Sequence, residues 1–105
     1  MLTHGHIDAR SREAHVLVAA RIEQNPELRQ IALENLDRWM SRTSGSEPYF
    51  LKWKEFLKGD LAELLMAMVS DTENACALRQ CSPFAGPAFI SQSERQELLK
   101  KYAAR

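Results

Sequence analysis

Short breaks divide this sequence into segments whose apolar residues recur at the spacing of an α-helix. The breaks contain the proline, glycine and capping residues that end one helix or begin the next, and they lie at 25–27, 43–46, 59–60, 70–73 and 79–87. Helices this short are not stable alone and must pack against one another. The sequence therefore predicts an all-α fold, a compact bundle of five or six short helices with a structured Pro/Gly loop before the last helix.

Capping residues indicate the helix boundaries in the first half of the chain. Asp8 is the predicted N-cap of a helix that runs to about Gln24, because its carboxylate can accept from the free amides of the first turn. A second helix is expected to begin at Pro26, since proline suits the first helical position. Ser46 is predicted to cap a third helix, which ends at Gly59.

Similar signals mark the boundaries in the second half. Asp60 is expected to open a fourth helix. Ser70 and Glu73 have the spacing of a capping box, which predicts either a fifth helix or a sharp bend in the fourth. Ser91 and Glu94 repeat this spacing and predict the start of the last helix.

Helical periodicity also predicts the core. Lysines alternate with aromatic residues over 49–58, a combination that occurs on nucleic-acid surfaces. The aromatic residues nevertheless fall at core spacing, which favours burial. The expected core residues are Ala14, Leu17, Val18, Ile22, Leu28, Ile31, Ala32, Leu36, Trp39, Tyr49, Phe50, Trp53, Phe56, Leu57, Leu61, Leu64, Leu65, Met68, Val69, Ala75, Leu78, Leu98, Leu99 and Tyr102.

The Arg79–Pro87 segment is the one stretch that helical periodicity does not explain. It contains two prolines, a glycine and Phe84. A solvated linker does not need an aromatic side chain, so Phe84 is expected to pack into the core, and Gly86 permits a backbone conformation that other residues avoid. A single glycine without a following Gly-Lys-Ser/Thr pattern excludes a phosphate-binding P-loop. The sequence places no base beside Cys81 or Ser82, so neither is predicted to be a nucleophile.

Length and charge limit the possible functions. The 105 residues predict a single helical domain, 1–105. Lys plus Arg and Asp plus Glu are each 14, so the formal net charge is zero and nothing attracts the whole molecule to nucleic acid. The apolar runs are much shorter than the about 20 residues that span a bilayer, and charged residues occupy the place of a signal sequence's apolar region. We therefore expect a cytoplasmic protein that makes no membrane contact.

The histidines and cysteines predict neither a metal nor a cofactor. His4 and His6 flank a glycine, but two imidazoles are too few for a rigid tetrahedral site. His15 lies at the edge of an apolar stripe and is expected to be a half-buried, hydrogen-bonded side chain, because no partner carboxylate or nucleophile can be identified. Cys76 and Cys81 are expected to be buried thiols, as is usual in a reducing compartment.

A longer motif covers the second half of the chain. A leucine-rich segment leads into Arg79–Gly86, and an acidic-basic pair, Glu94–Arg95, follows near the start of the last predicted helix. This arrangement resembles small all-helical bacterial proteins of uncharacterised function that carry an Arg-Gln-x-Ser-Pro-Phe-Ala-Gly loop. Asp8–Ser11 extends the resemblance into the first half, whereas Pro87–Phe89 depart from it. Such proteins are similar in size and setting to members of toxin-antitoxin or mobile-element modules, so the resemblance implies a partner from a two-gene module.

These observations favour a noncatalytic intracellular interaction protein. It would be the antitoxin-like or regulatory member of a bacterial two-gene module and would bind a protein partner or a second copy of itself. Alternatively, the two arginines among the candidate contact residues only tie the loop to neighbouring helices. The candidate contact residues are Arg79, Gln80, Ser82, Phe84 and Arg95.

Two other functions remain open from the sequence. A DNA-binding regulator would need a helix-turn-helix at the 59–60 corner, where the following helix is too apolar to read a major groove, or a local face of Arg10, Arg12 and Arg21. A small nuclease-like toxin would use His15 with nearby arginines. It would also need a positioned acid-base pair, which the sequence does not place.

Overall fold

The computed structural model describes residues 4–42 and 47–103, and the side chains of residues 4–8 and 47 lie outside that description. The regular elements over these residues are all helices, which confirms the predicted class. They are α1 (His4–Gln24), α2 (Leu28–Met40), α3 (Glu47–Lys58), α4 (Leu61–Val69), α5 (Glu73–Gln80) and α6 (Gln92–Lys101). A structured loop, residues 81–91, connects α5 to α6 as predicted, but it begins later than expected, because Arg79 and Gln80 are the last two residues of α5.

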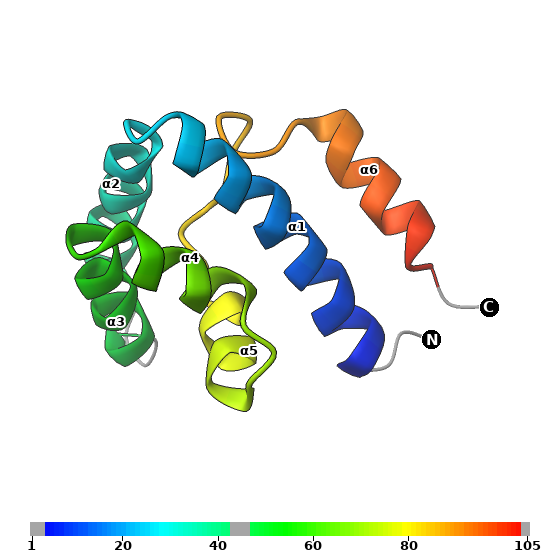
Figure 1. Cartoon of the computed structure of the whole chain (residues 1–105), viewed down its shortest axis with the longest axis horizontal. Coiled ribbons are helices and arrows are strands. Elements are labelled where there is room, and N and C mark those ends of the chain that lie inside the picture. The colour runs from blue at the N-terminus through cyan, green and yellow to red at the C-terminus, as the bar shows by residue number, and fades with distance from the viewer. Residues whose placement is uncertain (1–3, 43–46, 104–105) are drawn as a thin grey trace.

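Helix α1 is the element against which most of the others pack. It contacts α2, α4, α5 and α6, while α3 contacts α2 and α4, and α4 also contacts α5. Figure 1 shows α1 crossing the molecule, with α6 running back alongside it and with α4 and α5 on its other side. The pair α2 and α3 closes the end of the molecule at which α1 finishes.

The structure confirms two of the predicted caps. The carboxylate of Asp60 accepts from the Ala62 amide at the start of α4. At the start of α6, the Ser91 hydroxyl accepts from the Glu94 amide while the Glu94 carboxylate accepts from the Ser91 amide. Both hydrogen bonds of the predicted capping box are therefore present.

The starts of α1 and α2 differ from the prediction. Helix α1 already begins at His4, so Asp8 lies inside the helix and the predicted N-cap is wrong. Gly5 does not prevent this extension, because one glycine costs a helix only about 1 kcal/mol. Helix α2 begins at Leu28 rather than at Pro26, since residues 25–27 form a turn in which each carbonyl accepts from the amide three residues later.

The start of α5 also differs in its capping residue. A separate fifth helix begins at Glu73, which is one of the two predicted outcomes. Its N-cap is Thr72, whose hydroxyl accepts from the Ala75 amide over 3.1 Å, so the predicted capping box is wrong. Ser70 instead ends α4, because its extended backbone breaks the helical path there. The predicted cap Ser46 lies outside the described residues.

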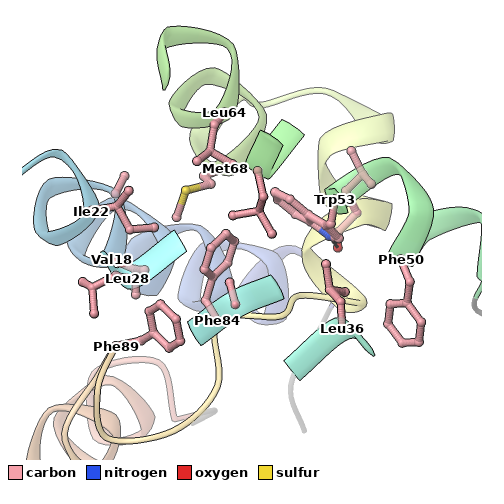
Figure 2. Packing of buried hydrophobic residues seen from close by; sticks show 14 residues of the cluster. Val18, Ile22, Leu28, Leu36, Phe50, Trp53, Leu64, Met68, Phe84 and Phe89 are labelled. Atoms are coloured by element: carbon pink, nitrogen blue, oxygen red, sulfur yellow. Dashed lines mark hydrogen bonds between the residues drawn. The ribbon is translucent and has the colours of Figure 1, made fainter. Parts of the chain in front are cut away.

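One buried apolar cluster joins the first five helices and the loop. Figure 2 shows the rings of Phe84 and Phe89 extending from the loop into this cluster. Phe84 is 8% exposed, which confirms its predicted burial. The large side chains that are completely buried are Trp53, Phe89, Ile22, Leu36, Leu57, Leu64, Met68 and Pro83.

Some predicted core residues lie at the surface instead. Ile31, Tyr49 and Leu99 are 36%, 42% and 45% exposed. Helix α6 packs mainly against α1 and has no buried residue, so an apolar stripe on it is only partly covered. Periodicity finds the apolar face of a helix but not how much of that face a neighbour covers.

Candidate functional site

Arg79, near the end of α5, joins this helix to the end of α4. Its side chain is buried, with the residue 3% exposed. The guanidinium donates from Nη1 to the Ser70 carbonyl over 2.7 Å and to the Met68 carbonyl over 3.3 Å. A cation at these carbonyls also suits the negative end of the α4 dipole. Arg79 therefore fixes the end of α5, from which the loop leaves, against α4.

His15 and Ser82 connect α1 to the loop. Nδ1 of His15 lies 2.7 Å from the Ser11 carbonyl, which only accepts, so the neutral ring carries its proton on Nδ1. Nε2 then accepts from the Ser82 hydroxyl over 2.8 Å, and the Ser82 Oγ accepts from the Phe84 amide over 3.2 Å. The predicted hydrogen-bonded histidine is confirmed, and at 7% exposure it is more deeply buried than expected.

Asn35 of α2 holds the middle of the loop. Its Nδ2 donates to the Pro83 carbonyl over 2.9 Å and to the Ala85 carbonyl over 3.4 Å. Asn35 is not among the candidates chosen from the sequence, although one signal points to it. It lies three residues after Ala32 and four before Trp39, on a stripe that is predicted to be buried, where an amide needs hydrogen-bond partners.

The ring of Phe84 fills the space between the loop and the helices. It meets three other rings edge-on, with centroid distances of 5.3 Å to Trp53, 5.6 Å to Phe89 and 5.8 Å to His15. This arrangement is favourable because the positive edge of one ring faces the negative face of another. Phe84 therefore organises the loop from within, and little of the residue is exposed.

Gly86 has the only positive φ among the described residues, at 104°. We expect Gly86→Ala to lower the free energy of unfolding by about 1–2 kcal/mol, because side chains with a Cβ disfavour this conformation. An added Cβ would meet no heavy atom within 4 Å, so the cost comes from the backbone alone. Urea denaturation measures it, and Gly86→Asn should cost less because asparagine tolerates positive φ better. Equal stability of wild type and G86A would contradict this account.

Arg21 joins α1 to the start of α6. Its guanidinium forms a two-pronged ion pair with the Glu94 carboxylate and also donates to the Phe89 carbonyl over 2.6 Å. The hydrogen bond from Arg21, followed by that from the Ser91 amide, lowers the pKa of Glu94 from 4.5 to about 2. This ion pair holds the end of the loop and the last helix in place.

The lowered pKa of Glu94 predicts a loss of stability in acid. A carboxyl whose pKa is lower in the folded state contributes its full stabilisation above the unfolded value of 4.5 and loses it as the pH falls toward about 2. We expect Glu94→Gln to remove this part of the acid dependence while keeping the capping box, since glutamine can also complete it. Urea midpoints measured across this pH range test the prediction. Glu97→Gln, one turn away, is the control, and an unchanged pH slope in E94Q would be contrary to expectation.

A groove of about 530 Å³ lies where α1, the loop and α6 meet. It brings together all five candidate contact residues, of which only Gln80 and Arg95 are exposed. No residue that lines it is acidic, although the chain as a whole has no net charge. Its lining residues are Arg10, Ser11, Ala14, His15, Arg79, Gln80, Ser82, Phe84, Ala85, Ile90, Arg95, Leu98 and Leu99.

Two arginines of this groove differ from the others around them. Within the described part of the chain, the side chains of Arg10 and Arg95 form neither a hydrogen bond nor an ion pair. Arg12 and Arg21, in contrast, donate to Val69 and to Glu94. Arg95 therefore has no side-chain hydrogen bond or ion pair to the described residues that could tie the loop to a helix. Arg10 joins the candidates, and only packing reveals that α1 and α6 place it in the same groove.

Other kinds of site have little support within residues 4–42 and 47–103. No three His, Cys, Asp or Glu side chains in this part gather so as to hold a metal ion, and the side chains of His4 and His6 lie outside the description. Cys76 and Cys81 form no disulfide, and both are half-buried rather than buried as expected. None of the helices described combines the length and the apolar character needed to cross a membrane.

Comparison with known proteins adds no relative. No protein-family model, no curated protein and no solved structure matches this chain. The class of the molecule therefore rests on its own structure: a small all-helical protein with a clamped loop beside a basic groove.

Proposed function

We propose that this chain is a noncatalytic interaction protein that binds a protein partner in the groove between α1 and α6. The observation that carries the proposal is the pair of uncommitted guanidinium groups, Arg10 and Arg95, in a hollow without a carboxylate. Like charges in one hollow repel each other, and an anionic group of a partner would relieve that repulsion. Gln80, which is exposed beside them, adds a hydrogen-bonding side chain.

The clamped loop supports this proposal because it gives the groove a stable wall. Asn35 and Arg21 hold the loop backbone, and the Ser82 hydroxyl is held by His15. A surface that is ordered before binding loses less conformational entropy when a partner binds. The buried candidates Arg79 and Phe84 would thus contribute to binding by positioning the groove rather than by touching the partner.

The resemblance described above supports the rest of the proposal. It suggests that the partner is encoded beside this chain in a bacterial two-gene module, with this chain as the antitoxin-like or regulatory member. Cys76 and Cys81 form no disulfide, as expected for the reducing, cytoplasmic setting of this proposal.

Purification of the tagged chain from its native host tests the proposal. We expect a stoichiometric protein partner with the wild type, identified by mass spectrometry and sized by light scattering. Arg95→Glu should lose this partner, because it reverses a charge in the groove. Arg42→Glu is the matched control, since Arg42 is exposed just after α2 and its side chain also has no hydrogen bond or ion pair to the described residues. A bare monomer or homodimer from the wild type would refute the proposal.

The contact between His15 and Ser82 favours a second candidate, the nuclease-like enzyme. Nε2 of His15 lies 2.8 Å from the Ser82 hydroxyl, beside a groove with arginines. A histidine base at this distance from a serine hydroxyl is the arrangement that activates a nucleophile. Burial of His15 and the second hydrogen bond to Ser82 favour a structural role instead. Incubation with labelled RNA and DNA distinguishes the two. Cleavage by the wild type that His15→Gln abolishes, with the fold intact, would replace the interaction protein by the enzyme.

A further inference from the structure

We infer that the groove recognises a carboxylate that lies next to an aliphatic side chain, so that the partner contributes a short acidic and aliphatic peptide segment. This inference rests on the proposed function and adds to it the chemistry of the ligand. It combines three properties of the groove: its charge, its apolar wall and its continuation over α6.

The charge of the groove selects an anion. Arg10 from α1 and Arg95 from α6 have guanidinium groups without hydrogen-bonding partners among the described residues. Arg79 lies in the lining with its side chain buried, and its charge adds to the positive potential. A guanidinium binds a carboxylate through two parallel hydrogen bonds, which gives both affinity and a defined orientation.

The wall of the groove selects an aliphatic neighbour for that anion. Leu99 is 45% exposed on α6 and lines the groove together with Leu98 and Ile90. A second hollow of about 460 Å³ adjoins the first and shares Ile90, Arg95 and Leu99 with it. Arg95 and Leu99 thus line two adjoining hollows. A segment of several residues can occupy both, with its carboxylate at Arg95 and an aliphatic side chain at Leu99.

The surroundings of the groove favour a peptide over a nucleic acid. One wall of the groove is apolar, because Ile90, Leu98 and Leu99 line it. A nucleic acid carries a phosphate at every residue and has no aliphatic side chain to pack there, and the zero net charge of the chain gives it no attraction beyond the groove. A peptide with one or two carboxylates between aliphatic side chains matches both the arginines and this wall.

Fluorescence anisotropy with synthetic probes tests the inference. The probes are a labelled peptide of alternating leucine and glutamate, the matching peptide of leucine and glutamine, and a labelled oligothymidine. We expect the wild type to bind the Leu-Glu peptide, more weakly as salt is added. Arg95→Glu and Arg10→Glu should each weaken this binding by about tenfold or more, because each replaces an attraction by a repulsion. Leu99→Ser should also weaken it, whereas Arg42→Glu should change it by less than about twofold, as expected for a charge outside the contact.

Several outcomes would overturn the inference. Equal binding of the Leu-Gln peptide would show that the carboxylate is not recognised. If R42E weakened binding as much as R95E, the peptide would be attracted by the overall charge of the protein and not by the groove. Tighter binding of oligothymidine, lost in R95E, would indicate a nucleic-acid groove. Circular dichroism of each variant excludes unfolding as the cause. If no peptide binds although a partner that depends on Arg95 co-purifies, the inference fails and the proposed function stands. If neither occurs, both fail.

Discussion

Replacing Phe84 with alanine is expected to lower the free energy of unfolding by about 3–5 kcal/mol. The substitution removes a ring that is 8% exposed and touches the rings of Trp53, Phe89 and His15. The surrounding helices are held by many other contacts and can collapse only partly into the space, so the cost includes a cavity as well as lost apolar burial. Urea denaturation measures this loss, provided that the free energy of unfolding falls with urea concentration at the same slope in both proteins.

Two further variants make the Phe84 prediction specific. Phe84→Leu keeps most of the apolar volume but loses the edge-on ring contacts, so it should cost only about 1–2 kcal/mol. Leu51→Ala, at a residue that is 51% exposed, should change stability by no more than about 0.5 kcal/mol. If F84A is too unstable to fold, the loss of stability in F84L can still be compared with that in L51A. A cost for F84A as small as that for L51A would show that the ring does not support the core.

Arg79→Met should lower the free energy of unfolding by about 2–3 kcal/mol. Methionine keeps much of the length and apolar surface of the side chain but cannot donate hydrogen bonds. The carbonyls of Met68 and Ser70, which accept from Arg79 at the buried end of α4, then lose a charged donor. The loss of the favourable interaction between a cation and this helix end adds to the cost.

Arg95→Met is the matched control for Arg79→Met. Arg95 is exposed and its side chain, among the described residues, makes no hydrogen bond or ion pair, so its replacement should change stability by no more than about 0.5 kcal/mol. The same variant should nevertheless weaken partner binding, because it removes the charge that we place at the contact. The two arginines would then have separate roles, one in stability and one in binding. Equal stability of R79M and R95M would argue against that separation.

The accuracy of the boundary predictions depended on how local each signal was. The capping box of Ser91 and Glu94 and the cap at Asp60 were correct, since a cap depends on residues within one turn. The same rule gave the wrong residue at Ser70, because Thr72 offers a competing hydroxyl two positions later. Asp8 failed as a cap because nothing before it interrupts the helix strongly enough.

The candidate site was predictable in part. The loop motif and the acidic-basic pair after it identified five residues that do meet around one groove, and the burial of Phe84 followed from its aromatic side chain in a segment with two prolines. Arg10 and Asn35 were missed as site residues. Arg10 lies 85 positions before Arg95, which is the difference of their numbers, and no local pattern relates them. Asn35 contacts the loop 48 positions away.

The sequence by itself determined the helical class, the starts of α4 and α6, and a loop with a buried aromatic side chain. These properties depend on interactions within a few residues, so they can be read along the chain. Only the tertiary structure decided which distant side chains meet: His15 with Ser82, 67 positions apart, and Arg21 with Glu94, 73 positions apart. It also decided that Leu99 stays exposed beside Arg95. The physical reason is that such contacts depend on how whole helices pack, which no local pattern of residues specifies.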